Sequence, residues 1–379
     1  MQVVQYSWPL AAWGAGAAAL FVAVLLVLTK DLHGRLSMDS SFGVQRFHTQ
    51  PTPRIGGIAI VSGVLLGALL LRGEARVMLQ VVVLAGAPAF AFGLLEDLTK
   101  RVSVAKRLFA TLGSGLLGWF ITGISITYVN VPVLDALLVW TPVAVLFTAV
   151  AVSGVANAVN IIDGFNGLAA GVALIVLSAI GLLSVRLGDV QLGHVCLNLA
   201  ASVAGFLLVN WPLGKLFLGD GGAYFVGFAI AWSAVLLLQR HAQVSAWCPL
   251  LICAYPVVEV LFSMLRRKQH RSLVGQPDRL HLHSLVKRRV VRRLFPQTTN
   301  LMRNSITGAL LGPLLSVPFA LWALAFYDDT PALVLGMIVF VLAYKLSYCR
   351  LTRFHWLGPR SGRRAGEGAA AATGFGHVE

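Results

Sequence analysis

Long runs of apolar residues dominate the chain, and short polar stretches separate them. Such runs predict transmembrane helices, because a helix of about 20 apolar residues crosses the hydrocarbon core of a bilayer. They lack the alternation of apolar and polar residues that a membrane β-barrel needs. We therefore expect an all-α integral membrane protein with eleven transmembrane helices, at about residues 8–29, 55–72, 77–95, 108–124, 131–152, 167–185, 194–210, 223–239, 247–264, 306–327 and 331–347.

The composition excludes a soluble globular protein. Hydrophobic residues make up 57% of the chain and charged residues only 12%. Charged residues are about 25% of an ordinary soluble domain, so a soluble fold would have too few of them to cover its surface.

The net charge of +15 lies mainly on one side of the predicted membrane. If the 30–54 loop is cytoplasmic, 26 of the 30 Lys and Arg residues fall on that side. Cytoplasmic loops carry such an excess in membrane proteins. We therefore expect the N-terminus outside and the C-terminus in the cytoplasm, and the basic residues need no nucleic-acid partner.

Residues 1–347 are expected to form one polytopic transmembrane catalytic domain. Its largest soluble element is the basic cytoplasmic loop 265–305, in which an amphipathic interfacial helix is predicted around residues 285–295. Residues 348–379 form a cytoplasmic tail whose Gly- and Ala-rich composition predicts disorder.

Polar residues are rare and gather on the predicted cytoplasmic face, in the segments 48–57, 93–107, 157–168, 217–223 and 270–285. These segments offer acids, amides, glycines, basic residues and histidines. A helical bundle brings its loops together at one end, so we expect an active site built from cytoplasmic loops.

Adjacent acids, Glu96 and Asp97, end the third predicted span. Two neighbouring carboxylates repel each other unless a cation lies near them. Lys100 is one turn away, and Mg²⁺ is a second candidate because it binds carboxylates and phosphate oxygens together. The alternative is a pair of solvated charges at a helix end.

Two further acids stand in Gly-containing turns. Asp163 lies in NIIDGFNG, where Asn157, Asn160 and Asn166 can orient it or bind phosphate and sugar hydroxyls. Asp220 lies in FLGDGGAYF, where a Gly-rich turn at a helix start offers backbone N–H groups to an anion. A carboxylate at that point suggests a metal that bridges to the anion. The alternative for both acids is a role in capping helices.

Basic residues and histidines complete the set. His281 and His283 alternate in DRLHLH, and Arg279 beside them favours phosphate recognition. Zinc is less favoured, because no Cys or third His lies close. His48 and Arg54 flank a Pro-containing turn of similar character. The alternative for the His-x-His pattern is a pair of surface histidines.

Glu259 lies inside the ninth predicted span. An ionisable residue within a span predicts a functional role. The alternative is an ion pair with Arg266 or Arg267 that serves folding.

Together these motifs resemble those of the polyprenyl-phosphate N-acetylhexosamine-1-phosphate transferases. NxxNxxDGxxGL, FLGD and DRxHLH follow in family order on one predicted face, and the resemblance covers nearly the whole chain. It implies an enzyme of the bacterial inner membrane that transfers a sugar-1-phosphate from a UDP-HexNAc donor to undecaprenyl phosphate and releases UMP. It also implies Mg²⁺ as cofactor, with Mn²⁺ as a substitute, the lipid bilayer as a partner, and a capacity to form a homodimer.

The resemblance assigns roles to residues of this chain. The catalytic acids would be Glu96, Asp97, Asp163 and Asp220, and the metal ligands Asp220, Asn160 and Asp97. The substrate-binding residues would be His48, Arg54, Lys100, Lys106, Arg107, Asn157, Asn160, Asn166, Arg279, His281 and His283.

The chain differs from family patterns in the acid pair and in the histidine motif. The family's acid pair is usually Asp-Asp, whereas this chain has Glu96 before Asp97. The branch that makes the peptidoglycan lipid precursor carries three histidines where this chain reads HLHS, which favours the branch that begins O-antigen, capsule or exopolysaccharide chains. The alternatives are the phospho-MurNAc-pentapeptide transferase of that other branch, and a transporter or flippase, whose polar groups would lie near the membrane midplane.

Overall fold

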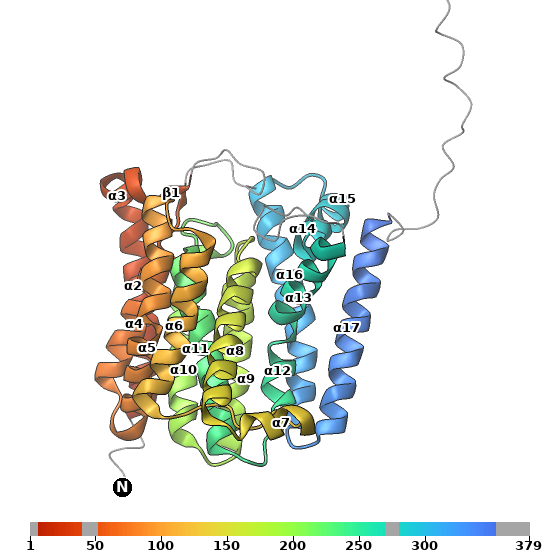
Figure 1. Ribbon diagram of the computed structural model, residues 1–379. Coiled ribbons are helices and arrows are strands. Elements are labelled where there is room, and N and C mark those ends of the chain that lie inside the picture. The colour runs from red at the N-terminus through yellow and green to blue at the C-terminus, as the bar shows by residue number, and fades with distance from the viewer. Residues whose placement is uncertain (1–6, 40–51, 270–279, 354–379) are drawn as a thin grey trace, which may run out of the picture.

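The computed structural model describes residues 7–39, 52–269 and 280–353 of the chain as a bundle of long helices that run roughly side by side (Figure 1). The long helices are α2 (Ser7–Leu28), α4 (Gly56–Leu70), α5 (Gly73–Thr99), α6 (Val104–Thr122), α8 (Thr141–Ile162), α9 (Leu168–Arg186), α10 (Val190–Asn210), α11 (Gly219–Arg240), α13 (Ala254–Gln269), α16 (Asn300–Ala325) and α17 (Thr330–Thr352). The short elements are α3 (Lys30–Ser37), α7 (Pro132–Leu138), α12 (Trp247–Ile252), α14 (Leu282–Val286), the π-helix η1 (Lys287–Val291), α15 (Arg292–Leu294), and the strands β1 (Met38–Asp39) and β2 (Thr52–Pro53).

The helical membrane architecture is confirmed. Within the described residues, eight helices are long and apolar enough to cross a membrane: α2, α5, α8, α9, α10, α11, α16 and α17. Each of the eleven predicted spans coincides with a helix or with two shorter ones, and the full count of eleven stays a prediction. Large apolar side chains such as Trp13, which is 78% exposed, cover the sides of the bundle, as contact with lipid requires.

Two predicted spans are interrupted. The span expected at 131–152 is instead the short helix α7 followed by α8, which has a proline in its first turn. The span expected at 247–264 divides into α12 and α13 at Cys253. Pro256 has no N–H to donate to the carbonyl of Ile252, so α12 cannot continue as a regular helix through this point.

Helix α11 is the centre of the bundle, with 94% of its most apolar 18-residue window buried. It packs against α4, α5, α8 and α9. Glycine permits the closest approaches. A Cβ atom on Gly93 of α5 would lie 2.6 Å from the Cα of Gly221, and one on Gly57 of α4 would lie 2.4 Å from the amide nitrogen of Gly222. The start of α11 is therefore held between two neighbouring backbones.

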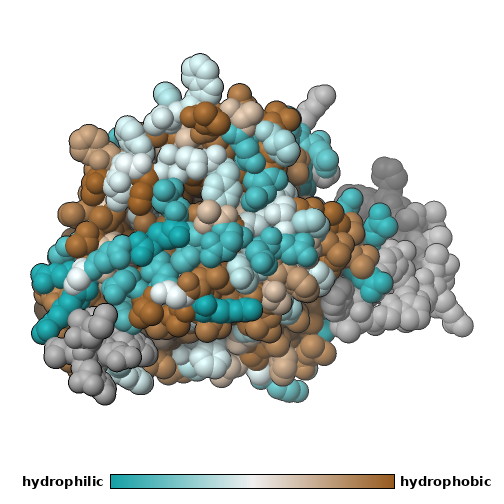
Figure 2. Space-filling model, turned by 90° about the horizontal axis from the view of Figure 1, so that it is seen from below, coloured by the Kyte–Doolittle hydropathy of each residue, from teal (hydrophilic) through white to brown (hydrophobic). Residues whose placement is uncertain are grey.

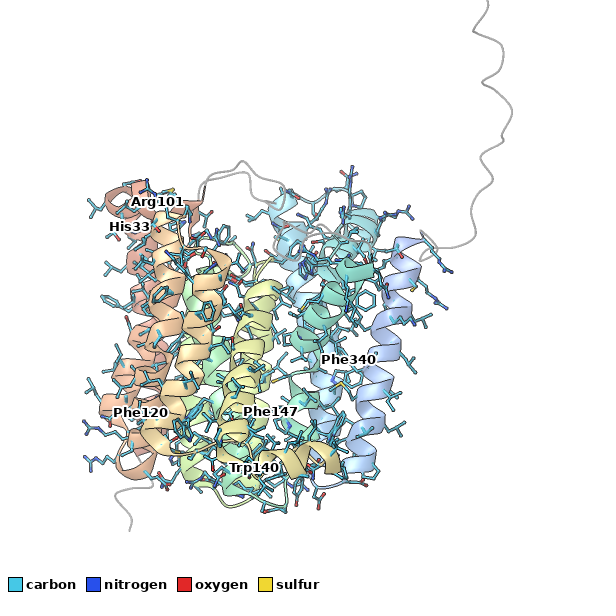
Figure 3. All side chains as sticks on the ribbon, viewed as in Figure 1. His33, Arg101, Phe120, Trp140, Phe147 and Phe340 are labelled. Carbon is cyan, nitrogen blue, oxygen red and sulfur yellow. The ribbon has the colours of Figure 1, made fainter. Side chains whose placement is uncertain are left out.

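The two ends of the bundle differ. One end, which we call the site end, carries α3, β1, α14 and α15 (Figure 1), and His33 and Arg101 lie there (Figure 3). The opposite end carries α7 and Trp140 (Figures 1 and 3). Seen from that opposite end, hydrophilic side chains form a band across the face, and hydrophobic side chains surround it (Figure 2).

The helix predicted around residues 285–295 is confirmed as the continuous helical segment formed by α14, η1 and α15. Its buried side includes Leu282, Leu285 and Val291, and Leu294 is 56% exposed at its end. The tail after residue 353 lies outside the described residues.

Candidate active site

The carboxylate of Asp220, in the first turn of α11, is the meeting point of three other segments. Its Oδ1 accepts hydrogen bonds from Asn160 Nδ2 at 3.0 Å and from Arg54 Nη2 at 3.3 Å. Its Oδ2 accepts from Arg107 Nη1 and forms an ion pair with it. The side chain of Asp220 is 10% exposed. The segment before α4, helix α6 and helix α8 therefore each contribute one side chain that binds the Asp220 carboxylate of α11 at the site end.

Asp97, at the end of α5, holds the start of α11. Its Oδ1 accepts the backbone N–H of Asp220 at 3.0 Å, and its Oδ2 accepts that of Gly221 at 2.9 Å. The residue is 1% exposed. A carboxylate at a helix N-terminus is favoured by the helix dipole. The sequence predicted that these N–H groups would be open to a substrate anion, but two of them bind Asp97. Asp220 is not the N-cap residue of α11, because that position is occupied by Leu218.

Backbone hydrogen bonds place Arg54 beside Asp220. The N–H of Phe217 donates to the carbonyl of Pro53 at 2.9 Å, and the N–H of Gly56 donates back to the carbonyl of Phe217 at 2.9 Å. Gly219 has φ of +75°, and a Cβ atom there would lie 2.0 Å from the carbonyl oxygen of Arg54. Only glycine fits this turn, so FLGD requires its glycine for a steric reason.

A polar contact between α6 and α8 sets the register of these two helices. Asn157 Nδ2 donates to Thr111 Oγ1 at 3.1 Å and to the carbonyl of Ser153 at 2.8 Å, and Thr111 Oγ1 lies 2.7 Å from Ser153 Oγ. Arg107 lies one turn before Thr111 and Asn160 one turn after Asn157, so this register carries both side chains to Asp220. Asn157, predicted to bind substrate from a loop, lies in α8 and joins two helices.

Asp163 follows α8 directly and is coupled electrostatically to the same cluster. Burial, and then the carboxylates of Asp220 and Asp97, raise the pKa of Asp163 to about 7, although the Arg54 guanidinium and the N–H of Gly219 oppose the rise. The sequence-predicted acids of three motifs thus act on one another through space. Asp163 lies outside the helices, and its carboxyl group changes charge near neutral pH.

Three more predicted site residues lie in or beside the turn between α5 and α6. Glu96 Oε2 accepts the N–H of Val102 at 2.8 Å, and Lys100 Nζ donates to the carbonyl of Asp97 at 2.6 Å. Lys106 is exposed, and its N–H donates to the N-cap Ser103. Their resolved contacts close the turn that precedes Arg107.

The histidine motif meets the Asp163 turn from the other side. The rings of His281 and His283 stack at 5.2 Å with 12° between their planes, and His283 lies edge-on to Phe165 at 5.3 Å. A Cβ atom on Gly164 would lie 3.3 Å from His283 Nε2. His283 is therefore adjacent to the residue that follows Asp163.

Two predicted residues, His48 and Arg279, lie outside the described residues. Asn166 is 2% exposed, and its Nδ2 donates to Ser305 Oγ of α16 at 3.1 Å. Its resolved contact joins a loop to α16 and not to the acids.

Sequence reasoning missed Lys287 of η1. Its ammonium lies 5.5 Å from the centre of the Phe165 ring. Burial, and then the charge of Arg303, lower the pKa of Lys287 to about 7. Lys287 begins the run KRRVVRR inside the predicted amphipathic helix, and nothing in the sequence distinguishes it from the basic residues that follow.

The acid cluster does not make a metal site from protein ligands alone. Among the residues that the structure describes, no three His, Cys, Asp or Glu side chains converge closely enough to hold a metal ion by themselves. Mg²⁺ is usually bound through one or two carboxylates together with substrate phosphates, so this arrangement fits a shared site better than a closed cage.

Comparisons with known proteins match the segment of the sequence that carries most of this cluster. The family model described as glycosyl transferase family 4 matches residues 79–238, which include Asp97, Arg107, Asn160, Asp163 and Asp220. A probable undecaprenyl-phosphate N-acetylglucosaminyl 1-phosphate transferase of Bacillus subtilis (strain 168) is 28% identical over 265 residues, 70% of this chain and 74% of the relative.

Two further relatives are similar to shorter or longer parts of the chain. An undecaprenyl-phosphate alpha-N-acetylglucosaminyl 1-phosphate transferase of Yersinia pestis is 26% identical over 274 residues, 71% of this chain and 74% of the relative. A phospho-N-acetylmuramoyl-pentapeptide-transferase of Clostridium perfringens (strain 13 / Type A) is 30% identical over 194 residues, 49% of this chain and 61% of the relative.

Proposed function

The chain belongs to the polyprenyl-phosphate N-acetylhexosamine-1-phosphate transferases, and we propose that it transfers GlcNAc-1-phosphate, or the 1-phosphate of a related HexNAc, from a UDP-sugar to undecaprenyl phosphate and releases UMP. The observation that carries this proposal is the convergence of Arg54 and Arg107 with Asp97, Asp163 and Asp220 at the site end. Guanidinium groups recognise phosphate, and acids beside them can hold a cation or a proton.

The donor and acceptor together bring three phosphate groups to the site. Arg54 and Arg107 both ion-pair with Asp220, and their side chains are 26% and 17% exposed. They are therefore accessible to an anion while Asp220 keeps them at the site end. We propose that they bind the diphosphate of the donor.

Mg²⁺ fits the oxygen atoms at this site. Asp220 provides a carboxylate, and Asn160, whose amide nitrogen donates to Asp220, provides a carbonyl oxygen. Asp220 is ionised in its pairs with Arg54 and Arg107, so Mg²⁺ would share this carboxylate with the two guanidinium groups. We propose that Asp220 and Asn160 would hold Mg²⁺ together with donor phosphates, whereas Asp97 positions Asp220. When bound, Mg²⁺ supplies charge neutralisation at the diphosphate.

The reaction itself needs placement more than covalent help. An oxygen of the acceptor phosphate attacks the β-phosphorus of the donor, and the bond from that phosphorus to the bridging oxygen breaks, so that this oxygen leaves with UMP. The bond from the sugar to its phosphate is untouched, and the anomeric configuration is kept. Asp163, with a pKa of about 7, is suited to hold or release a proton at the acceptor phosphate.

The distribution of basic residues supports a cytoplasmic site end. Lys100, Arg101, Lys106 and Arg107 lie in or beside the α5–α6 turn, and cytoplasmic loops are enriched in Lys and Arg. We propose that the enzyme works at the inner face of a bacterial plasma membrane and begins an O-antigen, capsule or exopolysaccharide chain. The similarity to the pentapeptide transferase covers about half of this chain, against 70% for the Bacillus relative.

The test is UMP release by the purified full chain with undecaprenyl phosphate, with Mg²⁺ or with EDTA, and with UDP-GlcNAc, UDP-GalNAc or UDP-MurNAc-pentapeptide. We expect acceptor-dependent UMP from UDP-GlcNAc or its epimer, lost with EDTA and in Asp220→Asn. The matched control is Asp328→Asn, an exposed carboxylate of the turn between α16 and α17.

Each outcome decides between readings. UMP from the MurNAc-pentapeptide donor alone would assign the peptidoglycan branch. No UMP from any donor, in protein shown to be folded by thermal unfolding, would contradict the proposal. Movement of labelled lipid between leaflets without UMP would support the transporter reading.

A further inference from the structure

A buried acid lies behind the histidine motif. Glu259 of α13 is 0% exposed. Its Oε1 accepts a hydrogen bond from His281 Nδ1 at 2.9 Å and one from the backbone N–H of Leu282 at 3.2 Å. Ser263, one turn further along α13, places its Oγ 3.1 Å from the same ring nitrogen. Two side chains of one helix face therefore hold one edge of the His281 ring.

The partners of Oε1 determine which ring nitrogen carries hydrogen. Oε1 accepts the N–H of Leu282, which can only donate. An ionised carboxylate has no hydrogen to donate, so in the 2.9 Å contact it is Nδ1 of His281 that carries the hydrogen. A second partner that orients a functional imidazole in this way fixes its tautomer and its plane.

The stacked rings of His281 and His283 connect Glu259 to the turn that carries Asp163. His281 stacks on His283 with nearly parallel planes, and His283 packs against Phe165 and beside Gly164. Glu259 is thus connected, through two rings, to the turn that carries Asp163.

We infer that Glu259 is a positioning residue, which holds His281 in its Nδ1–H form and thereby fixes the His281–His283 stack against the Asp163 turn. Its effect on catalysis rests on the proposed function, whereas its effect on the imidazole does not. The alternative from the sequence was an ion pair of Glu259 with Arg266 or Arg267. Among the described residues Glu259 pairs instead with His281, and Arg266 Nη1 donates to Tyr348 Oη at 2.7 Å and to the carbonyl of Leu280 at 2.9 Å.

A double-mutant cycle tests the inference with Glu259→Leu, His281→Ala and the double variant. We expect Glu259→Leu to lower kcat/KM for the donor about 10- to 100-fold, as loss of such an orienting partner does elsewhere. In the His281→Ala background the same substitution should cost nothing further, because its target is gone. Losses that multiply would mean that Glu259 acts independently of His281, and would overturn the inference.

Two variants guard against a merely structural effect. Glu259→Gln keeps an acceptor oxygen, so we expect a loss below about 5-fold, the difference between a charged and a neutral acceptor. A loss equal to that of His281→Ala would overturn positioning by this hydrogen bond. Tyr255→Phe is the matched control, since it removes a buried hydroxyl of α13 that has no hydrogen-bond partner among the described residues, and should leave kcat/KM unchanged.

A spectroscopic measurement makes the result independent of activity. In ¹⁵N-histidine-labelled protein, the His281 resonances, identified by their loss in His281→Ala, should show hydrogen on Nδ1 in the native chain and in Glu259→Gln, and a change in Glu259→Leu. Hydrogen on Nε2 alone in the native chain would overturn the inference. If the native chain releases no UMP, the proposed function fails, and this measurement still decides what Glu259 does to His281.

Discussion

A substitution of Asp97 distinguishes a residue that positions the site from one that contacts substrate. Both of its carboxylate oxygens accept backbone N–H groups of α11, at 3.0 and 2.9 Å, and Arg54 Nη2 lies 3.8 Å from Oδ1. In Asp97→Asn the side chain keeps its shape but only one acceptor oxygen. Its NH₂ group then faces a backbone N–H that has lost its partner.

The expected cost follows from these two bonds. A hydrogen bond to a charged group contributes about 1.5–3 kcal/mol, and a buried donor left without an acceptor costs a similar amount. Asp97→Asn should therefore lower the free energy of unfolding by about 2–3 kcal/mol. If the same energy is lost from the placement of Asp220, activity falls about 30- to 150-fold, because about 1.36 kcal/mol corresponds to a factor of ten.

The assay combines thermal unfolding in detergent with UMP release. Asp97→Asn should lose stability and activity together. Asp220→Asn should lose activity with a smaller loss of stability, since the Asp220 side chain makes no bond to the backbone of another helix among the described residues. Asp328→Asn serves again as the exposed control. Asp97→Asn with native stability and reduced activity would refute the positioning role, and native values of both would refute any role of the two hydrogen bonds.

Three further predictions concern packing, register and pH. Gly93→Ala should strongly destabilise the chain, because its Cβ would lie 2.6 Å from the Cα of Gly221. Gly113→Ala is the control, since a Cβ atom there would have no neighbour within 4 Å. Equal melting temperatures of the two variants would contradict the close packing of α5 on α11. Asn157→Ala should lower the free energy of unfolding by about 1–2 kcal/mol through its lost bonds to α6, measured in denaturant, and an unchanged midpoint would refute its role in register. Because the pKa of Asp163 rises from 3.8 to about 7, the folded chain keeps a proton between about pH 4 and 7 that the unfolded chain loses. The melting temperature should therefore fall as pH rises through that window, and Asp163→Asn should remove this dependence. A pH dependence that persists in Asp163→Asn would contradict the prediction.

Much of the architecture was predictable, because the length and apolar content of a segment indicate whether it can cross a membrane as a helix. The pattern also indicated which segments meet, since Asp97, Asp163 and Asp220 come from three separate motifs and share one electrostatic environment. The breaks at α7–α8 and α12–α13 were missed because an apolar run looks continuous whether or not a proline interrupts its hydrogen bonds.

The roles within the cluster were less accessible. Asp97 and its partner amide are 123 residues apart, and residue type alone does not show that a carboxylate will bind backbone rather than metal. Asn157 and Asn160 look equivalent in NxxN, yet about 4.5 Å of helical rise separates them. That rise takes Asn160 to Asp220 and leaves Asn157 against Thr111.

The contact between Arg54 and Asp220 has a consequence for the order in which the molecule is made. The two residues are 166 positions apart, so Arg54 leaves the ribosome long before its carboxylate partner exists. Asp97 likewise precedes the two amides that it binds. Insertion of the first seven described long helices therefore produces a bundle whose charged end is still incomplete. The arrival of α11 is the step that completes it, and a chain that stops before Gly219 would hold these charges without the partners that the finished protein gives them.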